Sequence, residues 1–343
     1  MTVADLTEAE LIGRVRAQLP PAPSWMIVGI GDDAAVVEPE RNRVAVLSVD
    51  ALVEGVHFDR AFTPPDAIGH RALAVNLSDL AAMGAEPRLA LLSLALPEAL
   101  TVADFDAMIA GFASLAARHR VHLAGGNLTR SPGPLVVDVT VMGTAKRRRA
   151  LLRGGARPGD ELYVSGTIGA ALAGLQMLRE RRLSTTEDTE DTEEQSESCV
   201  HRYLYPEPRI RLGSMLGRNR AASACMDLSD GLADAVWQIA EASGVGAAIE
   251  AGALPIEPDA RAWFASRGAD VEHEAITGGD DYELLIAVRP RARGRLAAAH
   301  RHGGVPLTRI GTCTGDRAIV MRRTVGDAAI DAQPLPRGYS HFR

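Results

Sequence analysis

The spacing of apolar and polar residues along the chain predicts an alternation of helices and strands. Segments in which apolar residues recur every three or four positions are predicted to be helices, and in the first half of the chain these are 7–19, 64–85 and 102–120. Shorter apolar or alternating runs are predicted to be strands: 25–37, 43–58, 88–97, 121–127 and 134–145. The strand at 121–127 is expected to run into a turn at the pair Gly125–Gly126.

The second half of the chain repeats this alternation. Residues 161–178 predict a strand, a glycine turn and a helix, and residues 275–288 predict a Gly-Gly turn, two aspartates and a strand. A strand followed by a helix is predicted at 224–244, with Ser229 or Asp230 as the cap that begins the helix. Both halves therefore predict α/β structure with acidic residues near strand ends.

Length and composition indicate a globular protein of two domains. The chain has 343 residues, of which 46% are hydrophobic and 24% charged, with a mean hydropathy of −0.01. Chains of this length usually divide into domains. The basic stretch at residues 146–149 and the glycine-rich segment after it mark the expected boundary, so we expect α/β domains at 1–148 and 149–343.

The apolar runs and the cysteines indicate a soluble cytoplasmic protein. The longest apolar stretch, Leu89–Pro97, is about half the length needed to cross a bilayer, and no basic-then-apolar signal pattern opens the chain. The three cysteines form no C-x-x-C pair, which argues against a disulfide framework or a zinc site. Cys225 is expected to be a core residue. No membrane partner is expected.

The formal net charge of −7 has one local source. Residues 184–198 contain seven acidic residues and no basic one, and removing these seven from the 44 acids leaves 37 against 37 bases. Because this segment has no apolar residues to bury, we expect a disordered surface insertion rather than a tail for a basic partner. No nucleic-acid partner is expected.

Lys146 is the only lysine in the chain, and it lies in a basic run rather than in a G-x-x-x-x-G-K-[ST] loop. This excludes a Walker-type ATPase and a kinase that depends on a strand lysine. If the protein handles phosphates, then metal ions, backbone amides and arginines must do so.

The segment "GIGDDAAVV" resembles a dinucleotide-binding fingerprint, with its glycine turn at Gly29 and Gly31. That fingerprint requires a following helix, but Pro39 comes five residues after Ala34 and a predicted strand follows it. Adjacent aspartates would also repel a pyrophosphate unless a cation lay between them. A cation site is therefore favoured over a nicotinamide-dependent dehydrogenase.

Carboxylates recur near glycine turns and strand ends throughout the chain. They are Asp32, Asp33, Asp50, Asp79, Asp227, Asp230, Asp280, Asp281 and Glu283. Any one of them is explained by a helix cap, an Asx turn or a solvated surface. Several lie within apolar segments with few basic residues nearby, where an unpaired carboxylate is costly to bury. Oxygen ligands without clustered Cys or His favour a hard ion such as Mg²⁺, which commonly bridges substrate phosphates.

These motifs together resemble a known family. The blocks "GIGDDAAVV", "SVDALVEGVHF", "ALAVNLSDLAAMGAEP", "AGGN", "LLRGGARPGDELYVSG", "DLSDGL" and "TGGDDYELLIAV" are similar to those of thiamine-monophosphate kinases, in the family's order. That family belongs to a superfamily with aminoimidazole ribonucleotide synthetase and selenophosphate synthetase.

The resemblance implies ATP-dependent phosphorylation of thiamine monophosphate to the diphosphate by direct transfer of the γ-phosphoryl group with Mg²⁺. The absence of an evident nucleophile agrees with this, because in phosphoryl transfer the protein mostly positions groups and neutralises charge. It also implies a two-domain synthetase-like fold, a homodimer formed through the N-terminal sheet, and ATP near the dimer and domain interfaces.

The resemblance also implies roles for individual residues. The implied magnesium ligands are Asp33, Ser48, the backbone carbonyl of Val49, Asp50, Asp79, Asn127, Asp227 and Asp230. The implied nucleotide contacts are Gly125, Gly126, Asn127, Arg153 and Ser229, with Arg153 neutralising charge. The implied substrate contacts are His57 and Asp280. Taken alone, Arg153 is explained by a solvated basic run and His57 by a surface position at a strand end.

Three positions depart from the family pattern. Asn127 stands where the family usually has aspartate, which removes one charge but keeps a carbonyl oxygen. Val49 stands where threonine is common. Pro336 stands where some members have an aromatic residue that stacks on the substrate, which leaves Tyr339 as the candidate there.

Two alternatives stay open at the level of the sequence. One is an enzyme like aminoimidazole ribonucleotide synthetase, and the other is a non-catalytic cation-binding homologue, which is kept as a minor alternative because of the departures at Asn127 and Val49. A selenophosphate synthetase is disfavoured because the first 40 residues contain neither a cysteine nor a lysine.

Overall fold

The structure is a computed structural model that describes residues 1–183, 193–325 and 329–338. Its contacts divide the chain into two compact units. Unit 1 comprises residues 1–80 and 86–147, and unit 2 comprises residues 81–85 and 148–343. Each unit has its own sheet and its own buried apolar residues.

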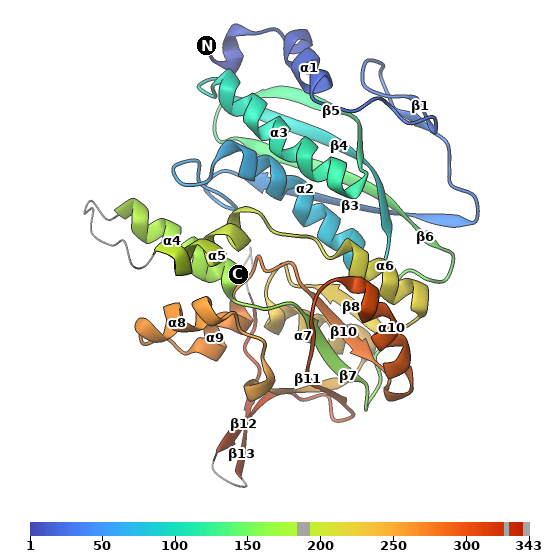
Figure 1. Cartoon of the computed structure of the whole chain (residues 1–343), viewed down its shortest axis with the longest axis vertical. Coiled ribbons are helices and arrows are strands. Elements are labelled where there is room, and N and C mark those ends of the chain that lie inside the picture. The colour runs from blue at the N-terminus through green and yellow to red at the C-terminus, as the bar shows by residue number, and fades with distance from the viewer. Residues whose placement is uncertain (184–192, 326–328, 339–343) are drawn as a thin grey trace. The chain divides into compact units, whose positions relative to one another are not determined.

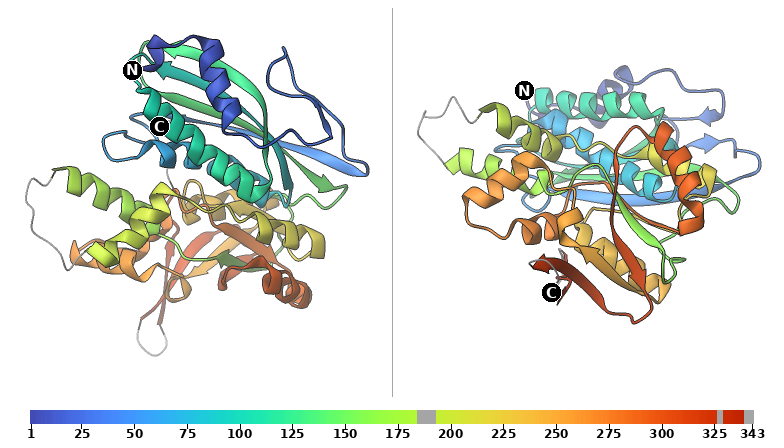
Figure 2. Two further views of the ribbon diagram at one scale, coloured as in Figure 1. Left: turned by 45° about the horizontal axis from the view of Figure 1, so that its top comes forward. Right: turned by 60° about the horizontal axis from the view of Figure 1, so that its bottom comes forward.

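Within the described residues, the main sheet of unit 1 has four strands in the order β3-β6-β4-β5. The strands are β3 (Arg43–Val53), β4 (Glu86–Pro97), β5 (His122–Ser131) and β6 (Val136–Lys146). β4 and β5 are parallel, whereas β6 is antiparallel to both neighbours. Figures 1 and 2 show α2 (Pro65–Ala82) and α3 (Val102–His119) running along this sheet.

The helices α2 and α3 cross with their backbones in contact. A Cβ atom at Gly69 would lie 1.8 Å from the carbonyl oxygen of Met108, and one at Gly111 would lie 2.0 Å from that of Asp66. Only glycine leaves room for so close an approach. These two helices and α1 (Glu8–Ala17) confirm the three helices predicted for the first half of the chain. A short 3₁₀ helix, η1 (Val3–Asp5), precedes α1.

Two strand predictions in unit 1 were wrong in detail. Residues 25–37 form a hairpin of two short antiparallel strands, β1 (Met26–Val28) and β2 (Val36–Val37), with Gly31 between them at a φ of 121°. The predicted turn at Gly125–Gly126 is absent, because β5 continues through both glycines to Ser131. No helix follows Ala34, which confirms that the dinucleotide fingerprint does not apply.

Within its described residues, unit 2 contains a seven-stranded sheet in the order β13-β12-β9-β11-β7-β10-β8. The strands are β7 (Glu161–Ser165), β8 (Ala224–Asp227), β9 (Gly246–Glu250), β10 (Leu284–Val288), β11 (Leu307–Thr314), β12 (Ile319–Val325) and β13 (Ala329–Pro334). Neighbouring strands are antiparallel, except β12 and β9, which are parallel.

The helices of unit 2 form separate groups around this sheet. They are α4 (Ala170–Leu183), α5 (Glu193–Leu204), α6 (Ile210–Asn219), α7 (Leu232–Ser243), α8 (Pro258–Ser266), α9 (Val271–Thr277) and α10 (Arg293–Gly303), with the 3₁₀ helices η2 (Ala251–Ala253) and η3 (Pro290–Ala292). Helices α4, α5, α8 and α9 lie together on one side of unit 2, and α6 and α10 lie together on the other (Figures 1 and 2).

The strand β10 is buried on both of its faces. Leu285 and Ala287 belong to the same apolar cluster as α7, whereas Leu284, Ile286 and Val288 belong to the cluster that contains residues of α6 and α10. A strand covered on both faces has no polar side to present to water, which explains its unbroken apolar sequence. The predicted strands and helices at 161–178, 224–244 and 275–288 are confirmed.

Two further expectations for unit 2 were wrong in part. The acidic segment 184–198 was expected to be disordered, but α5 begins at Glu193, so its last six residues are helical. Residues 184–192 lie outside the described residues. The helix α7 is capped by Gly231 rather than by Ser229 or Asp230, and no side chain donates or accepts a capping hydrogen bond there.

The described residues contain no helix that is both long enough and apolar enough to span a membrane. The cysteines Cys199, Cys225 and Cys313 are buried free thiols. Burial raises the pKa of all three, to about 12 for Cys199 and Cys313. The prediction that Cys225 is a core residue is confirmed.

Candidate functional site

Two loops of unit 2, far apart in the sequence, are joined by backbone hydrogen bonds. The first begins at Asp227, the last residue of β8, and carries Ser229 and Asp230, and the second precedes β10 and begins at Gly278. The Asp280 N–H donates to the Ser229 carbonyl oxygen at 2.8 Å, and the Tyr282 N–H donates to that of Leu228 at 3.1 Å. The fold therefore brings the predicted nucleotide contact Ser229 next to the predicted substrate contact Asp280.

Glycines allow these two loops to approach so closely. A Cβ atom at Gly279 would lie 2.6 Å from the Ser229 carbonyl oxygen, and one at Gly231 would lie 2.7 Å from that of Gly278. Gly231 also has a φ of 93°, which L-residues with a side chain rarely adopt. The glycines of "DLSDGL" and "TGGDDYELL" thus allow the backbones of the two loops to come into contact.

The second loop has an unusual backbone conformation. Asp280 and Tyr282 have φ values of 68° and 49°, in the left-handed region that residues other than glycine rarely adopt. Tyr282 donates its phenolic hydroxyl to Oδ1 of Asp280 at 3.0 Å. Tyr282 is buried, whereas Asp280 is half-buried, so the tyrosine holds a carboxylate that solvent and ligands can reach.

The acidic residues in the first loop differ in burial. Asp227 is 3% exposed and lies opposite Leu284 in the β8–β10 ladder, whereas Asp230 is half-buried. Mg²⁺ in proteins commonly takes one or two carboxylates, and water and phosphate oxygens supply the remaining ligands. The oxygens of this loop have the right chemistry for such an ion.

A second group of predicted ligands lies in unit 1, on β3 and α2. Ser48 donates its hydroxyl to Oδ2 of Asp79. Asp50 lies two residues beyond Ser48, so both side chains leave β3 on the same face. The side chain of Val49 lies on the opposite face and is 58% exposed, which leaves its backbone carbonyl as the group available near Asp50.

The glycine-rich segment of β5 lies across the sheet from β3. Asp50 pairs with Val139, which pairs with Leu92, which in turn pairs with Gly126. Three strand spacings separate β3 from β5, or roughly 14 Å. Within one chain, an ion held by Ser48, Asp50 and Asp79 is therefore a different ion from one held by Asn127.

The hairpin β1–β2 brings a further predicted ligand towards β5. Met26 of the hairpin packs against Leu89 and Ala124, and Gly29 lies beside the Ala124 carbonyl oxygen. The segment "GIGDD" thus lies close to "AGGN" within unit 1. Asp33 is exposed at the end of this segment, and its N–H donates to Oδ1 of Asp32 at 2.9 Å.

The arrangement of these residues is accompanied by similarity to known proteins along most of the chain. Residues 31–145 match the family described as AIR synthase related protein, N-terminal domain, and residues 157–323 match the corresponding C-terminal domain. Thiamine-monophosphate kinase of Salmonella typhimurium is 40% identical to this chain, covering 92% of it and 91% of the relative. The chain belongs to the thiamine-monophosphate kinase family. The resemblance drawn from the sequence motifs is thereby confirmed.

Solved structures of thiamine-monophosphate kinases have the same fold. The enzyme from Stenotrophomonas maltophilia K279a matches with a TM-score of 0.80 and 39% identity, covering 92% of this chain and 96% of that one. The structure described as AaThiL complexed with AMPPCP and TMP matches with a TM-score of 0.74 and 31% identity, covering 100% and 99%. The predicted two-domain α/β fold is confirmed.

The remaining residues implied by the thiamine-monophosphate kinase family have ordinary local contacts in this chain. Nδ1 of His57 accepts a hydrogen bond from the Val53 N–H at 3.0 Å. Arg153 is exposed, and one of its terminal nitrogens donates to Oε1 of Gln238 on α7.

The end of the described chain is fixed to α7. The indole N–H of Trp237 donates to the carbonyl oxygens of Leu335 and Pro336 at 3.3 and 3.2 Å. The guanidinium of Arg337 lies 3.8 Å from the centre of the Trp237 ring. A Cβ atom at Gly338 would lie 2.5 Å from the Asp230 carbonyl oxygen, so this segment ends against the first loop. Tyr339 lies outside the described residues.

Among the described residues, no three or more His, Cys, Asp or Glu side chains are grouped so that they could hold a metal ion together. Among the predicted ligands of this kinase-family member, Ser48 contacts Asp79, and Asp227 and Asp230 lie three residues apart in the chain. Sequence reasoning did not find Tyr282, because its contact with Asp280 depends on two positive φ angles that no local pattern reveals.

Proposed function

We propose that this chain phosphorylates thiamine monophosphate to thiamine diphosphate, using ATP and Mg²⁺. The observation that carries the proposal is the match along the whole chain to a thiamine-monophosphate kinase structure with AMPPCP and TMP. The P–O bond between the γ-phosphorus and the bridging oxygen of ATP breaks, a bond forms to an oxygen of the substrate phosphate, and ADP leaves. Because that phosphate is ionised at neutral pH, the reaction needs little help from a general base.

The chain's own residues position the reactants. Ser229 and the segment Gly125–Asn127 contact the nucleotide, Arg153 neutralises phosphate charge, and His57 and Asp280 contact the acceptor. Oxygens of the magnesium ligands hold the metal: Asp33, Ser48, Val49, Asp50, Asp79, Asn127, Asp227 and Asp230. When bound, Mg²⁺ supplies electrostatic stabilisation of the transferred phosphoryl group. The hydrogen bond between Asp280 and Ser229 supports this assignment because it couples an acceptor contact to a nucleotide contact.

The functional unit in this proposal is a homodimer formed through the sheet of unit 1. Every second residue of β3 from Ala45 to Ala51 is apolar and exposed, and Leu47 and Val49 are 67% and 58% exposed. Leu91 of β4 is also exposed. A row of apolar side chains on the face of a sheet is typical of a surface that another chain covers. A second copy of the same sheet fits such a surface.

The decisive test of the function is a product assay. Purified protein is incubated with ATP and Mg²⁺, and thiamine, thiamine monophosphate or the substrate of aminoimidazole ribonucleotide synthetase is added in separate reactions. Mass spectrometry should detect thiamine diphosphate and ADP in equal amounts only with thiamine monophosphate. Turnover of the ribonucleotide substrate would instead support the synthetase alternative, and no turnover in any reaction would support the non-catalytic one.

A further inference from the structure

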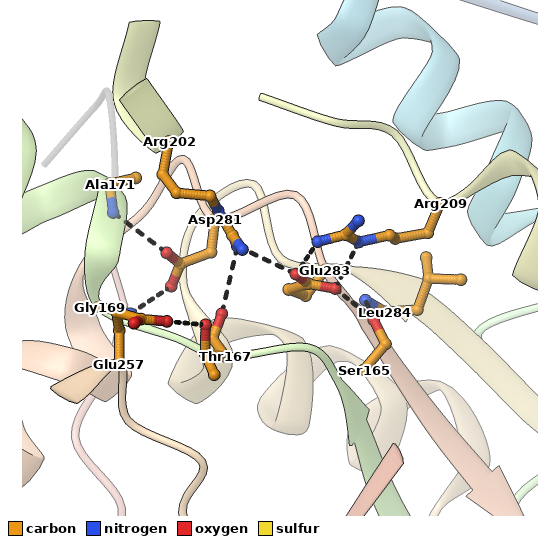
Figure 3. A network of polar contacts seen from close by, with 10 residues as sticks. All are labelled: Ser165, Thr167, Gly169, Ala171, Arg202, Arg209, Glu257, Asp281, Glu283 and Leu284. Carbon is orange, nitrogen blue, oxygen red and sulfur yellow. Dashed lines mark hydrogen bonds and ion pairs between the residues drawn. The ribbon is translucent and has the colours of Figure 1, made fainter. Parts of the chain in front are cut away.

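Two carboxylates of the loop at 278–283 point into the interior of unit 2 (Figure 3). Asp281 is 4% exposed and Glu283 is completely buried. They alternate with Asp280 and Tyr282, the two residues with positive φ. The proposed acceptor contact therefore lies in a segment whose neighbouring residues are anchored in the protein.

Asp281 is anchored to the beginning of α4. Its Oδ2 accepts a hydrogen bond from the Gly169 N–H at 2.8 Å, and its Oδ1 accepts one from the Ala171 N–H at 3.3 Å. Backbone N–H groups at the start of a helix lack partners within the helix and favour a carboxylate. Asp281 thus ties the loop to α4.

Glu283 is anchored by two arginines from other parts of the chain. Its carboxylate is 3.0 Å from a terminal nitrogen of Arg202 on α5 and accepts a hydrogen bond from Nε of Arg209 at 2.7 Å. The Ser165 hydroxyl donates to it as well. A carboxylate at this depth is tolerated only with such partners, and removing one of them leaves charge uncompensated. The position of Glu283 is therefore fixed by three separate segments.

Arg202 also connects this carboxylate to the turn before α4. Its guanidinium is 3.3 Å from the Thr167 carbonyl oxygen, and Thr167 in turn donates its hydroxyl to Glu257. Figure 3 shows Arg202 between the Thr167 carbonyl and Glu283. The helices α4 and α5 thus both contact the loop, one through Asp281 and the other through Glu283.

These anchors explain how an unfavourable backbone persists. Left-handed conformations at non-glycine residues are unfavourable and survive only where the surroundings determine them. Here the Leu228 N–H donates to the Glu283 carbonyl oxygen at 2.9 Å, and the N–H groups of Asp280 and Tyr282 are bonded to the first loop. Asp281 and Glu283 are held inside, and they flank Tyr282 and follow Asp280, so the anchors constrain both residues that have positive φ.

We propose that Glu283, together with Arg202, is a positioning residue for the acceptor. The pair holds the loop so that the Asp280 carboxylate, bonded to the Tyr282 hydroxyl, faces thiamine monophosphate. This rests on the proposed function, since it takes Asp280 as an acceptor contact. Glu283 is completely buried and Arg202 is paired with it, so in this proposal their loss acts through Asp280.

A purely structural role for the ion pair makes a different prediction, and unit 2 offers a matched control. Glu161 on β7 is also buried, with a side chain 5% exposed, and it pairs with Arg293 and Arg309. It lies at the opposite end of β7 from Ser165, which contacts Glu283. If such pairs only stabilise the sheet, Glu283→Gln and Glu161→Gln should have the same consequences.

The test compares Glu283→Gln, Arg202→Gln and Glu161→Gln as full-length proteins. Positioning predicts that the first two raise the KM for thiamine monophosphate by about fivefold or more while the KM for ATP changes by less than about twofold. Arg202→Gln leaves Arg209 and Ser165 in place, so it reports on positioning even if Glu283→Gln does not fold. Glu161→Gln should leave both KM values unchanged.

A second readout does not depend on enzyme activity. Amide hydrogen exchange at Asp280 and Tyr282 should accelerate by about tenfold in the two loop variants but not in Glu161→Gln, because those amides are bonded to the first loop. If wild-type protein shows no kinase activity, the proposed function fails, yet exchange still tests the positioning. Folded Glu283→Gln and Arg202→Gln proteins with wild-type exchange and an unchanged KM for thiamine monophosphate would overturn the inference.

Discussion

Tyr282 donates its hydroxyl to Oδ1 of Asp280 at 3.0 Å, although the two residues are separated by only one position and both have positive φ. In an extended strand, residues two apart lie on the same face but their side chains stand parallel. The left-handed turns at Asp280 and Tyr282 instead bring the hydroxyl onto the carboxylate. The tyrosine thereby orients a half-buried acidic group.

Removal of that hydroxyl should weaken binding of the acceptor. Tyr282→Phe keeps the ring and its packing but removes the hydrogen bond to the Asp280 carboxylate. We expect the KM for thiamine monophosphate to rise about three- to tenfold with little change in kcat, which corresponds to one hydrogen bond to a charged group. Steady-state kinetics measure this. Tyr163→Phe is the matched control, because the Tyr163 hydroxyl donates to Glu161 at 3.1 Å and neither residue belongs to the two loops. Equal effects of the two variants would contradict the prediction.

The contact of Gly338 with the first loop should affect magnesium binding. In Gly338→Ala the new Cβ atom would meet the Asp230 carbonyl oxygen at 2.5 Å and the Asp234 side chain at 2.7 Å. Asp230 or the C-terminal segment must then move, so we expect the magnesium concentration for half-maximal activity to rise about threefold or more. Gly252→Ala is the control, because no atom lies within 4 Å of its Cβ position. A wild-type magnesium dependence in Gly338→Ala would argue against the assigned role of Asp230.

Asp281 makes stability depend on pH. Burial raises the pKa of Asp281 to about 7, although Arg202 and the N–H groups of Gly169 and Ala171 oppose the rise. The folded protein therefore keeps a proton that the unfolded chain loses near pH 4. This contribution to stability is fully present below about pH 4 and is lost as the pH rises to about 7, by at most about 4 kcal/mol.

The variant Asp281→Asn cannot ionise at this position and lacks that dependence. Its free energy of unfolding, relative to that of the wild type, should therefore rise between about pH 4 and 7 and then level off. Urea unfolding of both proteins at several pH values measures the difference. Parallel pH profiles would show that Asp281 is ionised in the folded protein across this range.

Restoring the charge at residue 127 should strengthen magnesium binding. Asn127 is exposed on β5, where its amide oxygen is a weaker ligand for a hard cation than a carboxylate. We expect Asn127→Asp to lower the magnesium concentration for half-maximal activity by about threefold or more. Activity measured against magnesium concentration tests this. An unchanged dependence would remove Asn127 from the set of ligands.

Disruption of the apolar row on β3 should dissociate the proposed dimer. Leu47→Glu places a charge among exposed apolar side chains that a second copy would cover, where burial of the charge is costly. Light scattering after gel filtration should give the mass of a dimer for the wild type and that of a monomer for the variant. Leu152→Glu is the control, because Leu152 is 57% exposed but belongs to unit 2. A wild type that is monomeric at all concentrations would contradict the proposal.

Much of the fold followed from periodicity, and the exceptions have a common cause. The helices α2 and α3 were predicted because their apolar residues recur every three or four positions, and the strand β10 was predicted from a short continuous apolar run. The hairpin at 25–37 was missed because the whole run was taken for one strand. In the structure the apolar residues on either side of Gly31 form two short strands. Gly125 and Gly126 were taken for a turn, but they lie in a strand because Gly126 packs against the Leu92 carbonyl oxygen.

The sequence proposed residues for the candidate site, but it did not predict their arrangement. Motifs in the sequence were sufficient to indicate the family and to single out Asp227, Ser229 and Asp280. They gave no indication that Asp50 and Asn127 lie on opposite edge strands of one sheet. Strand order depends on contacts between distant segments, and a local pattern does not encode it.

The sequence by itself determined which segments are helical or extended, which acidic residues accompany glycines, and which family the motifs resemble, because those properties depend on the order of residues along the chain. Only the tertiary structure decided that Glu283 meets Arg202, Arg209 and Ser165, and that Tyr282 orients Asp280. Those contacts join residues up to 118 positions apart. A buried charge selects its partners by proximity in space, and proximity exists only once the chain has folded.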